Sequence, residues 1–252
     1  MSTQKHALIF GVTSELGQHC ARVWLAEGWR VTGTSRRAEV DLPALEGVEL
    51  QQLDFNDQAD VERWVGTLDD CPDLVLFAAA DYPEGDADGI SLSDASRVFS
   101  VNALAPFWLS MQLLGKKSPE QFSCFIFCGT CAMYNADRGS GVYGASKAAL
   151  RVLSATVADY CAGANAAAAD LILGHLKNQW KLDQMAALAE KFEVPQQEVT
   201  NRYLKKSEPN IKVDHFIDFA HCERAIRYIY ETGASANGMS LRLDGGAAGS
   251  YI

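Results

Sequence analysis

Tyr143 and Lys147 stand four residues apart in the segment GVYGASKAAL. On a helix, this spacing puts both side chains on one face, where the phenol and the ammonium can converge on one substrate. A free tyrosine has a pKa near about 10 and is a poor base at neutral pH, but a neighbouring ammonium favours the phenolate and lowers that pKa. The pair is therefore a candidate for acid–base chemistry, although the same spacing is common on surface helices.

Thr130 precedes Tyr143 by thirteen residues and lies between Cys128 and Cys131 in the segment CGTC. Two cysteines separated by two residues are typical of thiol–disulfide enzymes and of half a zinc site. The sequence has no second pair of this kind, and its seven cysteines are scattered, mostly within apolar runs. This pattern suits buried thiols in a reducing compartment. We expect no structural disulfide and no metal site, and redox use of CGTC is the weaker interpretation.

A nucleotide site is indicated by GVTSELG, which follows an apolar run at residues 6–10. Gly11 and Gly17 would flank a turn from a strand into a helix. Glycine there lets the backbone approach a diphosphate whose charge is held by the helix N-terminus. The turn also contains Thr13, Ser14 and Leu16. The motif predicts a dinucleotide site, with an ordinary tight turn as the alternative.

Arg36 and Arg37 follow the next apolar run, at residues 29–35. In dinucleotide-binding folds the end of this strand faces the adenosine ribose, and an acidic residue there accepts the ribose hydroxyls. The segment TSRR has no acidic residue at that place. The two arginines therefore favour a 2′-phosphate, and hence NADP(H) over NAD(H); two solvated surface arginines are the alternative.

Short apolar runs alternate with longer helical patterns along the chain. The expected strands are residues 6–10, 29–35, 48–55, 73–80, 122–128, 169–174 and 239–246. A long helical pattern occupies about residues 98–114, and another follows Tyr143. The alternation predicts an α/β fold, a single-domain doubly wound (Rossmann) parallel seven-stranded sheet with helices on both faces. We expect one NAD(P)-binding domain over residues 1–252.

Residues 175–213 interrupt the alternation with two amphipathic patterns, the second beginning near Pro195. An insertion after the carboxyl end of a strand lies on the face where such sheets bind ligands. We therefore expect a helical substrate lid there.

The chain is acidic, with a net charge of −10 and a pI near 4.9. Such a surface repels nucleic-acid phosphates and anionic lipid, so neither nucleic acid nor membrane is an expected partner. The opening MSTQKHALIFG has too short an apolar run for a signal peptide or a spanning helix. We expect a cytoplasmic protein that acts on a small molecule.

Taken jointly, the motifs resemble those of the short-chain dehydrogenases/reductases, in their compact single-domain branch, over essentially the whole chain. The matching segments are GVTSELG for the cofactor turn, LDFND with Asp54 for the adenine contact, VNALAPF with Asn102, the hydroxyl of Thr130, YGASK, and NGMSLRLDGG as the closing strand.

The resemblance implies hydride transfer between a nicotinamide and a carbonyl or secondary alcohol. It implies that Tyr143 is the general acid/base, and that Lys147 lowers its pKa and holds the nicotinamide ribose. Thr130 would hydrogen-bond the substrate oxygen, and Asn102 would position a water in a proton relay. The implied cofactor-binding residues are Gly11, Thr13, Ser14, Leu16, Gly17, Arg36, Arg37, Asp54, Phe55, Ala79, Tyr143, Lys147 and Gly174. A homodimer or homotetramer, packed through the helices after Asn102 and Tyr143, is also implied.

Three departures from the family pattern affect the cofactor loops. Glu15 replaces the middle glycine of the turn, Ala78 in FAAADY stands where the family has asparagine, and Leu173 replaces a proline. These departures are the reason for an alternative interpretation, in which the protein is a non-catalytic dinucleotide-binding regulator or scaffold of the same fold. An enoyl reductase is disfavoured because that group places six residues between its tyrosine and lysine.

The substrate is less defined by the sequence. Candidate substrate-lining residues are Tyr134, Arg138, His175 and Trp180. Arg138 could hold a carboxylate with two hydrogen bonds, and the lid weakly resembles that of 3-hydroxybutyrate dehydrogenases. An exposed loop arginine is more often simply solvated, so a hydroxy acid is one option among several.

Overall fold

A seven-stranded, all-parallel sheet forms the centre of the computed structural model, which describes residues 4–37, 42–83, 88–135 and 139–249. The strands are β1 (His6–Phe10), β2 (Arg30–Ser35), β3 (Glu49–Gln52), β4 (Leu74–Phe77), β5 (Ser123–Thr130), β6 (Ala166–Leu173) and β7 (Ser240–Leu243). Their spatial order is β3-β2-β1-β4-β5-β6-β7. The predicted α/β doubly wound sheet is confirmed.

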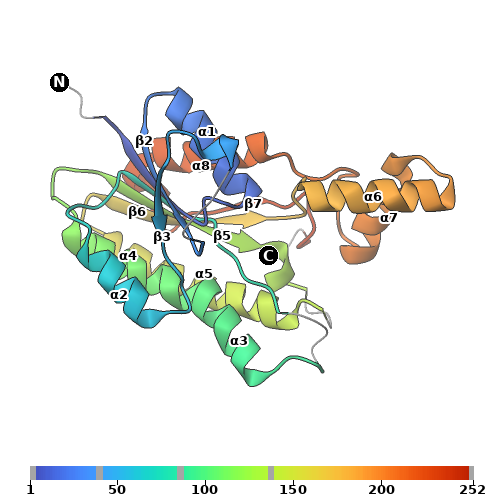
Figure 1. The fold of residues 1–252 in the computed structure, drawn as a ribbon, viewed down its shortest axis with the longest axis horizontal. Helices are drawn as coiled ribbons and strands as arrows, with labels where there is room; N and C mark the ends of the chain where they lie inside the picture. The colour runs from blue at the N-terminus through green and yellow to red at the C-terminus, as the bar shows by residue number, and fades with distance from the viewer. Residues whose placement is uncertain (1–3, 38–41, 84–87, 136–138, 250–252) are drawn as a thin grey trace.

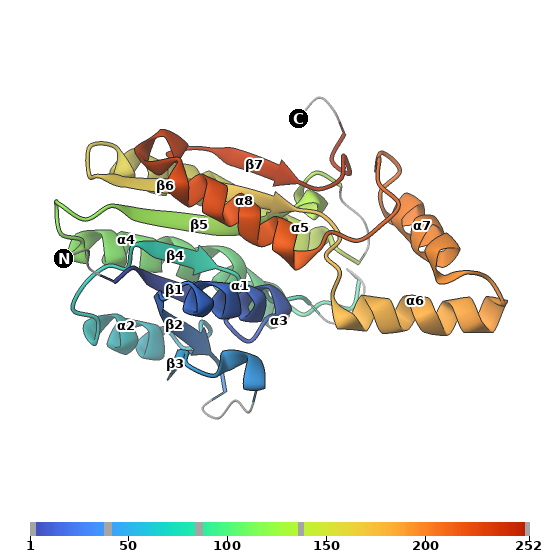
Figure 2. The ribbon, with the colours of Figure 1, turned by 90° about the horizontal axis from the view of Figure 1, so that it is seen from above.

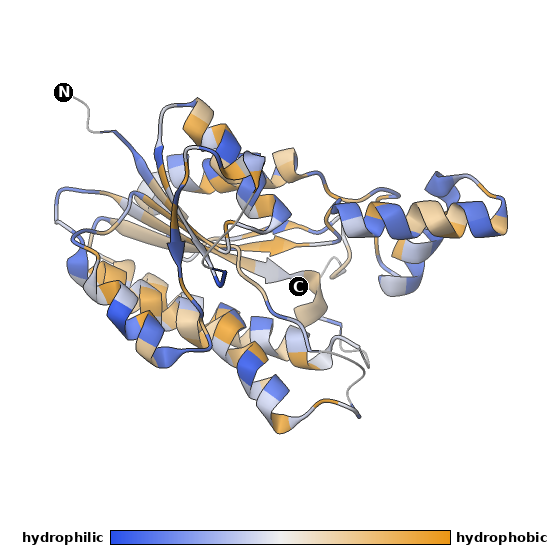
Figure 3. Ribbon diagram, viewed as in Figure 1, coloured by the Kyte–Doolittle hydropathy of each residue, from blue (hydrophilic) through white to orange (hydrophobic). Residues whose placement is uncertain are grey.

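Helices cover both faces of the sheet (Figures 1 and 2). They are α1 (Glu15–Ala26), α2 (Gln58–Gly66), α3 (Leu92–Phe99), α4 (Ala105–Lys116), α5 (Gly141–Cys161), α6 (Gln179–Phe192), α7 (Gln196–Ser207) and α8 (Phe219–Glu231). Helices α1 and α8 pack on one face through buried residues such as Trp24 and Ile226. Helices α2, α4 and α5 pack on the other through residues such as Trp64 and Leu109. Figure 3 shows the mixture of apolar and hydrophilic residues along these helices that one-sided packing requires.

The three central strands are joined by a stack of phenylalanine rings. Phe10, Phe77 and Phe127 are register partners on β1, β4 and β5, and all three are almost fully buried. The ring centroids are 4.8 Å apart for Phe10 and Phe77, and 4.9 Å for Phe77 and Phe127. Each such pair contributes about 1 kcal/mol beyond its buried area. The stack keeps the carboxyl ends of these strands side by side, which is where the site forms.

The turn from β1 into α1 approaches the end of β4 very closely. Gly11 has a φ of +80°, and a Cβ placed on it would lie 2.6 Å from the backbone N and Cα of Ala79. Ser14 caps α1, its Oγ accepting a hydrogen bond from the N–H of Gly17 (3.1 Å). The sheet order reverses between β1 and β4, so this turn borders the crevice in which doubly wound sheets bind ligands.

Several element boundaries differ from the sequence-based expectation. Strand β3 ends at Gln52, so Asp54 and Phe55 belong to the following loop. Strand β6 begins at Ala166, inside an alanine run whose low strand propensity hid it. The helix expected at 98–114 begins at Leu92 and includes a π-helical turn, Ser100–Leu104.

Helices α6 and α7 form the expected insertion and extend beyond the carboxyl ends of the strands (Figure 2). Pro195 is the N-cap of α7, as its position predicted. Met185 and Leu204 are fully buried between the two helices, in a cluster that also contains Cys131 and Ala247. The insertion is thus anchored on the loops at the end of the sheet.

The segment 92–116 passes a length and hydropathy test for a membrane-spanning helix. Half of its apolar window is buried inside the protein, including Leu109 and Leu113 in the core below the sheet. A core helix satisfies the same test, so the feature is explained by packing.

The turn at Gly11 generates a stability prediction with a built-in control. Gly28 has nearly the same φ, +82°, but nothing lies within 4 Å of its added Cβ. Gly28→Ala should lower the free energy of unfolding by about 1 kcal/mol, the cost of the left-handed conformation. Gly11→Ala should cost about 2–4 kcal/mol because overpacking adds to that cost. Urea unfolding measures both, and equal losses would contradict the close contact.

Candidate active site

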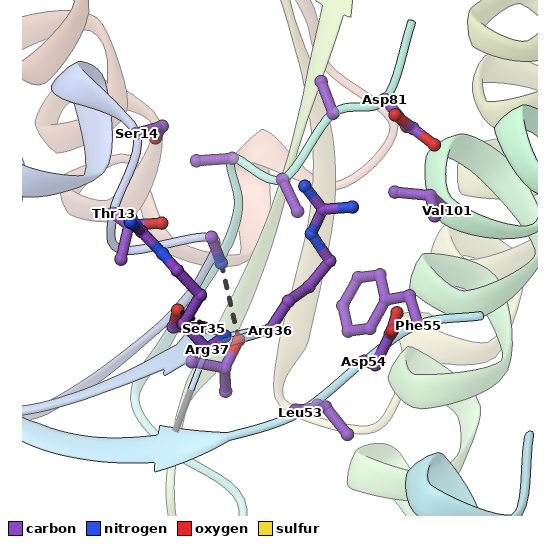
Figure 4. A pocket seen from close by; sticks show the side chains of 15 residues that line it. Thr13, Ser14, Ser35, Arg36, Arg37, Leu53, Asp54, Phe55, Asp81 and Val101 are labelled. Carbon is purple, nitrogen blue, oxygen red and sulfur yellow. Dashed lines mark hydrogen bonds between the residues drawn. The ribbon is translucent and has the colours of Figure 1, made fainter. Parts of the chain in front are cut away.

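The first cavity, of about 530 Å³, lies at the carboxyl ends of β1, β2 and β4 (Figure 4). Its lining residues are Gly11, Thr13, Ser14, Thr34, Ser35, Arg36, Arg37, Leu53, Asp54, Phe55, Ala78, Ala79, Ala80, Asp81 and Val101. Eight of the residues predicted to bind a cofactor are in this set. Gly17 lies outside it, in the first turn of α1, where its N–H serves the helix cap.

Arg36 and Arg37 are exposed at the rim of this cavity, directly after β2. In Figure 4 the Arg36 guanidinium reaches into the middle of the pocket. Ser35 Oγ accepts a hydrogen bond from the Arg37 N–H (3.1 Å), and Gln52 Nε2 donates to the Arg36 carbonyl (3.2 Å). Neither guanidinium has an ion-pair partner among the described residues. Both charges are therefore available to an anionic ligand.

A second cavity, of about 280 Å³, adjoins the first and shares Ser14, Ala78 and Ala80 with it. Its other lining residues are Glu15, Leu16, Tyr82, Cys128, Gly129, Thr130, Tyr143, Lys147, Leu173, Gly174, Leu176, Asn178, Lys181 and Phe219. Strand β5 supplies Thr130 at its last position, and helix α5 supplies Tyr143 and Lys147. The fold thus brings three of the four predicted catalytic residues to one cavity, and Asn102 is not among its lining residues.

Burial dominates the electrostatics of this second cavity. It raises the pKa of Tyr143 well above its ordinary value, while a hydrogen bond with Thr130 acts in the opposite direction. Burial also lowers the pKa of Lys147 to about 8. The Lys147 ammonium donates to the carbonyl of Cys128 (3.0 Å). In the ligand-free protein at neutral pH, Tyr143 is therefore a protonated phenol that can act as an acid.

Tyr82 also belongs to this cavity and was not predicted from the sequence. Its ring stacks on that of Tyr143, with centroids 4.1 Å apart and planes at 23°. Its hydroxyl donates to the Tyr143 oxygen (3.1 Å). The residue is 59% exposed, so it forms the outer wall of the site. A tyrosine in a loop gives no sequence signal of such a contact.

Asn102 lies beside the cavity, in the π-helical turn, and is fully buried. Its side-chain oxygen accepts from the Asp81 N–H (2.8 Å), and its amide nitrogen donates to the Asp81 carbonyl (2.8 Å) and to Ser146 Oγ (3.0 Å). These bonds fix the loop after β4. The water-positioning role of Asn102 stays a prediction.

The altered loop after β4 is also held by charge. The carboxylate of Asp81 forms an ion pair and a hydrogen bond with Arg97 of α3. Together with the backbone contacts of Asn102, this pair fixes the segment FAAAD at both its main chain and its side chain. The loss of the family's asparagine at Ala78 therefore does not leave the loop without support.

Glu15, another departure from the family pattern, accepts hydrogen bonds from the first turn of α6. Both of its carboxylate oxygens lie within hydrogen-bond distance of the Gln179 N–H (3.1 and 3.0 Å), in the first turn of α6. The N-terminus of a helix favours negative charge, and Asn178 caps the same turn through the Lys181 N–H. The residue ties the cofactor turn to the lid.

Of the four residues predicted to line the substrate site, the three that the structure describes differ in their exposure and their contacts. Trp180 is 65% exposed and is not among the residues that line the second cavity. Tyr134 packs in the lid cluster, and its hydroxyl accepts from Arg151 (2.6 Å). His175 is partly buried beside that cluster, its ring making an edge contact with Tyr203. Arg138 lies outside the described residues.

The cysteines of CGTC are not poised for thiol chemistry. All seven cysteines of the chain are free and buried. Burial raises the pKa of Cys128 to about 11 and that of Cys131 to about 12, so both are protonated at neutral pH and poor nucleophiles. Among the described residues, no group of three or more His, Cys, Asp or Glu side chains is placed to hold a metal ion.

Comparison with known proteins agrees with this geometry. The model of the NAD-dependent epimerase/dehydratase family matches residues 7–173, which is more than half of the chain. The chain belongs to this family of the short-chain dehydrogenases/reductases. The matched segment runs from β1 to the end of β6 and thus includes Thr130, Tyr143 and Lys147.

The individual relatives of this short-chain dehydrogenase/reductase are distant. It is 32% identical, over 157 residues, to serine 3-dehydrogenase of Agrobacterium fabrum (strain C58), an alignment that covers 58% of this chain and 62% of that protein. A short-chain dehydrogenase family protein of Francisella tularensis matches with a TM-score of 0.78 at 14% identity, over 97% of this chain and 98% of that one. Levodione reductase matches with a TM-score of 0.78 at 16% identity, over 98% of both chains. These two likenesses show the fold.

The position of Glu15 predicts an effect on nucleotide binding. Glu15→Gln keeps an oxygen for the Gln179 N–H but removes a charge near the expected diphosphate. We expect the dissociation constant of the reduced dinucleotide to fall about fivefold, which corresponds to about 1 kcal/mol of relieved repulsion. Fluorescence titration measures it.

Glu27→Gln is the matched control, since Glu27 caps the far end of α1 and pairs with Arg227. It should leave nucleotide affinity unchanged. If Glu15→Gln weakens nucleotide binding and Glu27→Gln does not, the Glu15 carboxylate must raise nucleotide affinity by holding α6 more than it lowers that affinity by repulsion.

Proposed function

We propose that the protein is an NADP(H)-dependent oxidoreductase that transfers hydride between nicotinamide and a carbonyl or secondary alcohol substrate. The observation that carries this proposal is the convergence of Thr130, Tyr143 and Lys147 on a cavity continuous with a second one rimmed by two arginines. The name of the curated relative, serine 3-dehydrogenase, is consistent with oxidation of an alcohol.

The residues present fit a dinucleotide. Gly11 leaves room where a Cβ would collide with Ala79, and the N-terminus of α1 opens onto both cavities through Ser14. Helix N-termini bind phosphate through free N–H groups and the helix dipole. Asp54 and Phe55 would flank the adenine, and Arg36 and Arg37 would hold the 2′-phosphate.

When bound, the nicotinamide supplies or accepts the hydride. In reduction, the Tyr143 phenol gives its proton to the substrate oxygen, and the Thr130 hydroxyl donates a hydrogen bond to the same oxygen as its charge develops. Lys147 sits one helical turn from Tyr143, where its charge favours the phenolate left behind. Tyr82 shields the phenol from water, and Asn102 keeps the loop carrying Tyr82 in place.

The direction of the pKa shift of Tyr143 favours the reductive role at neutral pH. Because burial raises this pKa, the phenol is protonated and ready to donate in the ligand-free site. Oxidation needs the phenolate and is therefore promoted by rising pH. A non-catalytic dinucleotide-binding regulator of the same fold is the alternative, and the variant below separates the two.

Tyr143→Phe tests the proposed function. Loss of the general acid should reduce the rate of NADPH oxidation with an aldehyde, ketone or keto-acid substrate about 100- to 10,000-fold. The NADPH dissociation constant should change less than about threefold, since the ring remains. Tyr228→Phe, on the exposed side of α8, is the control and should keep full activity. A wild-type protein that binds NADPH but oxidises it with no member of the panel would instead support the regulator.

Arg36→Asp tests the cofactor assignment. Reversing this charge should weaken NADPH binding about 100-fold and NADH binding about threefold or less, because only NADPH carries the 2′-phosphate. Arg224→Asp, on the exposed side of α8, makes the same change of charge away from the cavity and should affect neither. Equal losses for the two nucleotides would refute the preference for NADP(H).

The exposed apolar residues of the α4–α5 face support a homodimer or homotetramer. Leu104, Val152 and Tyr160 are 54%, 70% and 62% exposed. An apolar hollow lined by Phe55, Leu104 and Trp108 lies on the same side. We infer that this face is covered by a second copy of the chain in solution, a state that light scattering measures. The seven free, buried cysteines support the cytoplasm as its location.

A further inference from the structure

Lys181 is a cation of the second cavity without a partner. It lies in the first turn of α6 and lines the cavity together with Thr130 and Tyr143. Its side chain is half-buried. The described residues offer its ammonium no hydrogen bond and no ion pair, only the face of the Phe216 ring, 5.8 Å from the ring centroid. Burial lowers its pKa, so the charge is incompletely solvated and would gain from an anion.

The ammonium lies on the lid side of the cavity. Its charge lowers the pKa of the His175 imidazole, after β6, and the Cys131 thiol, next to Thr130, acts to raise the pKa of Lys181. His175 Nε2 is buried and makes no hydrogen bond within the described part of the chain. Burial, and then Lys181, lower the pKa of this imidazole to about 4, so it is neutral and can offer one N–H. Two unused donor groups thus lie near one another.

The other charges around the cavity are engaged. Glu15 accepts from the Gln179 N–H, and Lys147 donates to the Cys128 carbonyl. The buried carboxylate of Glu208 is 3.9 Å from His175 Nε2 and accepts from Asn135 Nδ2 and Cys131 Sγ. Among the described residues that line this cavity, Lys181 is therefore the cation left to a ligand.

We propose that Lys181, assisted by His175, binds the carboxylate of a short hydroxy or oxo acid whose alcohol or carbonyl oxygen lies at Thr130 and Tyr143. The inference rests on the proposed function and adds the substrate class to it. The cavity of about 280 Å³ must also admit the nicotinamide, so the acid has only a few carbon atoms. A cofactor phosphate offers the same anionic chemistry, but Lys181 lines the cavity that holds Thr130 and Tyr143 and does not line the one that holds Gly11 and Thr13.

The test uses matched probes that differ only in charge: 2- and 3-hydroxy acids of three to five carbons, and the corresponding neutral amides. Lys181→Met keeps the aliphatic stem and removes the ammonium, Lys181→Arg keeps a charge, and Lys191→Met alters an exposed lysine at the far end of α6. Three quantities are measured for each variant: the NADPH dissociation constant, kcat/KM with NADP⁺, and the shift in Tm on adding each probe to the NADP⁺-loaded protein.

Lys181→Met should lower kcat/KM for the acids about 10- to 100-fold, with less than threefold change for the amides, and should abolish the Tm shift given by the acids. Lys181→Arg should retain most of both effects, and Lys191→Met all of them. NADPH affinity should stay within threefold in every variant.

Three results would overturn the inference. The first is a wild-type protein that shows no preference for acids over amides. The second is a loss of kcat/KM in Lys181→Met that is equal for acids and amides. The third is a loss confined to NADPH affinity, which would assign the ammonium to the cofactor phosphate. The outcome is separable from that of the proposed function. If neutral substrates are turned over and the Lys181 variants do not change that rate, the proposed oxidoreductase function is supported without the acid site. If the acids shift Tm only when Lys181 is present, but no turnover occurs, the acid site is supported without the proposed function.

Discussion

The structure depends on the close approach of the β1–α1 turn to the end of β4. At Gly11 the two backbones are so near that any side chain would collide with Ala79. The stacked rings of Phe10 and Phe77, at the ends of the same two strands, fix that approach from within the core. The sheet order reverses at this point, so the contact lies at the crevice where both cavities open, the one with Gly11 and the one with Thr130 and Tyr143.

Around this contact, the polar groups are used mainly to hold loops in place. Asn102 binds both backbone groups of Asp81, the Asp81 carboxylate is paired with Arg97, and Glu15 is bound by the lid. Buried polar groups are costly unless they are hydrogen-bonded. The charges that remain without such partners among the described residues, on Arg36, Arg37 and Lys181, therefore stand out as groups that a ligand would satisfy.

Much of the fold and part of the site follow from the sequence. Strands with continuous apolar runs were found correctly because burial on both faces requires such runs. The meeting of Thr130, Tyr143 and Lys147 in one cavity was predictable because the helical spacing of the last two, and the strand end of the first, are local properties. Boundaries were less accurate where the residues, such as the alanines that open β6, have little preference of their own.

What could not be predicted depends on contacts between distant segments. The partner of Glu15 lies 164 positions away, and no spacing rule links the two. Tyr82 reads as a loop aromatic until the fold brings it onto Tyr143, and Trp180 reads as a cavity residue although its side of α6 is exposed. Lys181 resembles any lysine of an amphipathic helix, because its isolation from acidic partners is a property of the folded lid.

The hydrogen bonds between Glu15 and the Gln179 N–H also have a thermodynamic meaning. They connect the turn that borders the nucleotide cavity to the first turn of the lid, which borders the substrate end. Coupling between two binding sites is reciprocal. If a bound nucleotide changes the affinity for the second ligand by some factor, that ligand changes the affinity for the nucleotide by the same factor. Any coupling that this single carboxylate transmits between the two cavities must therefore act equally in both directions.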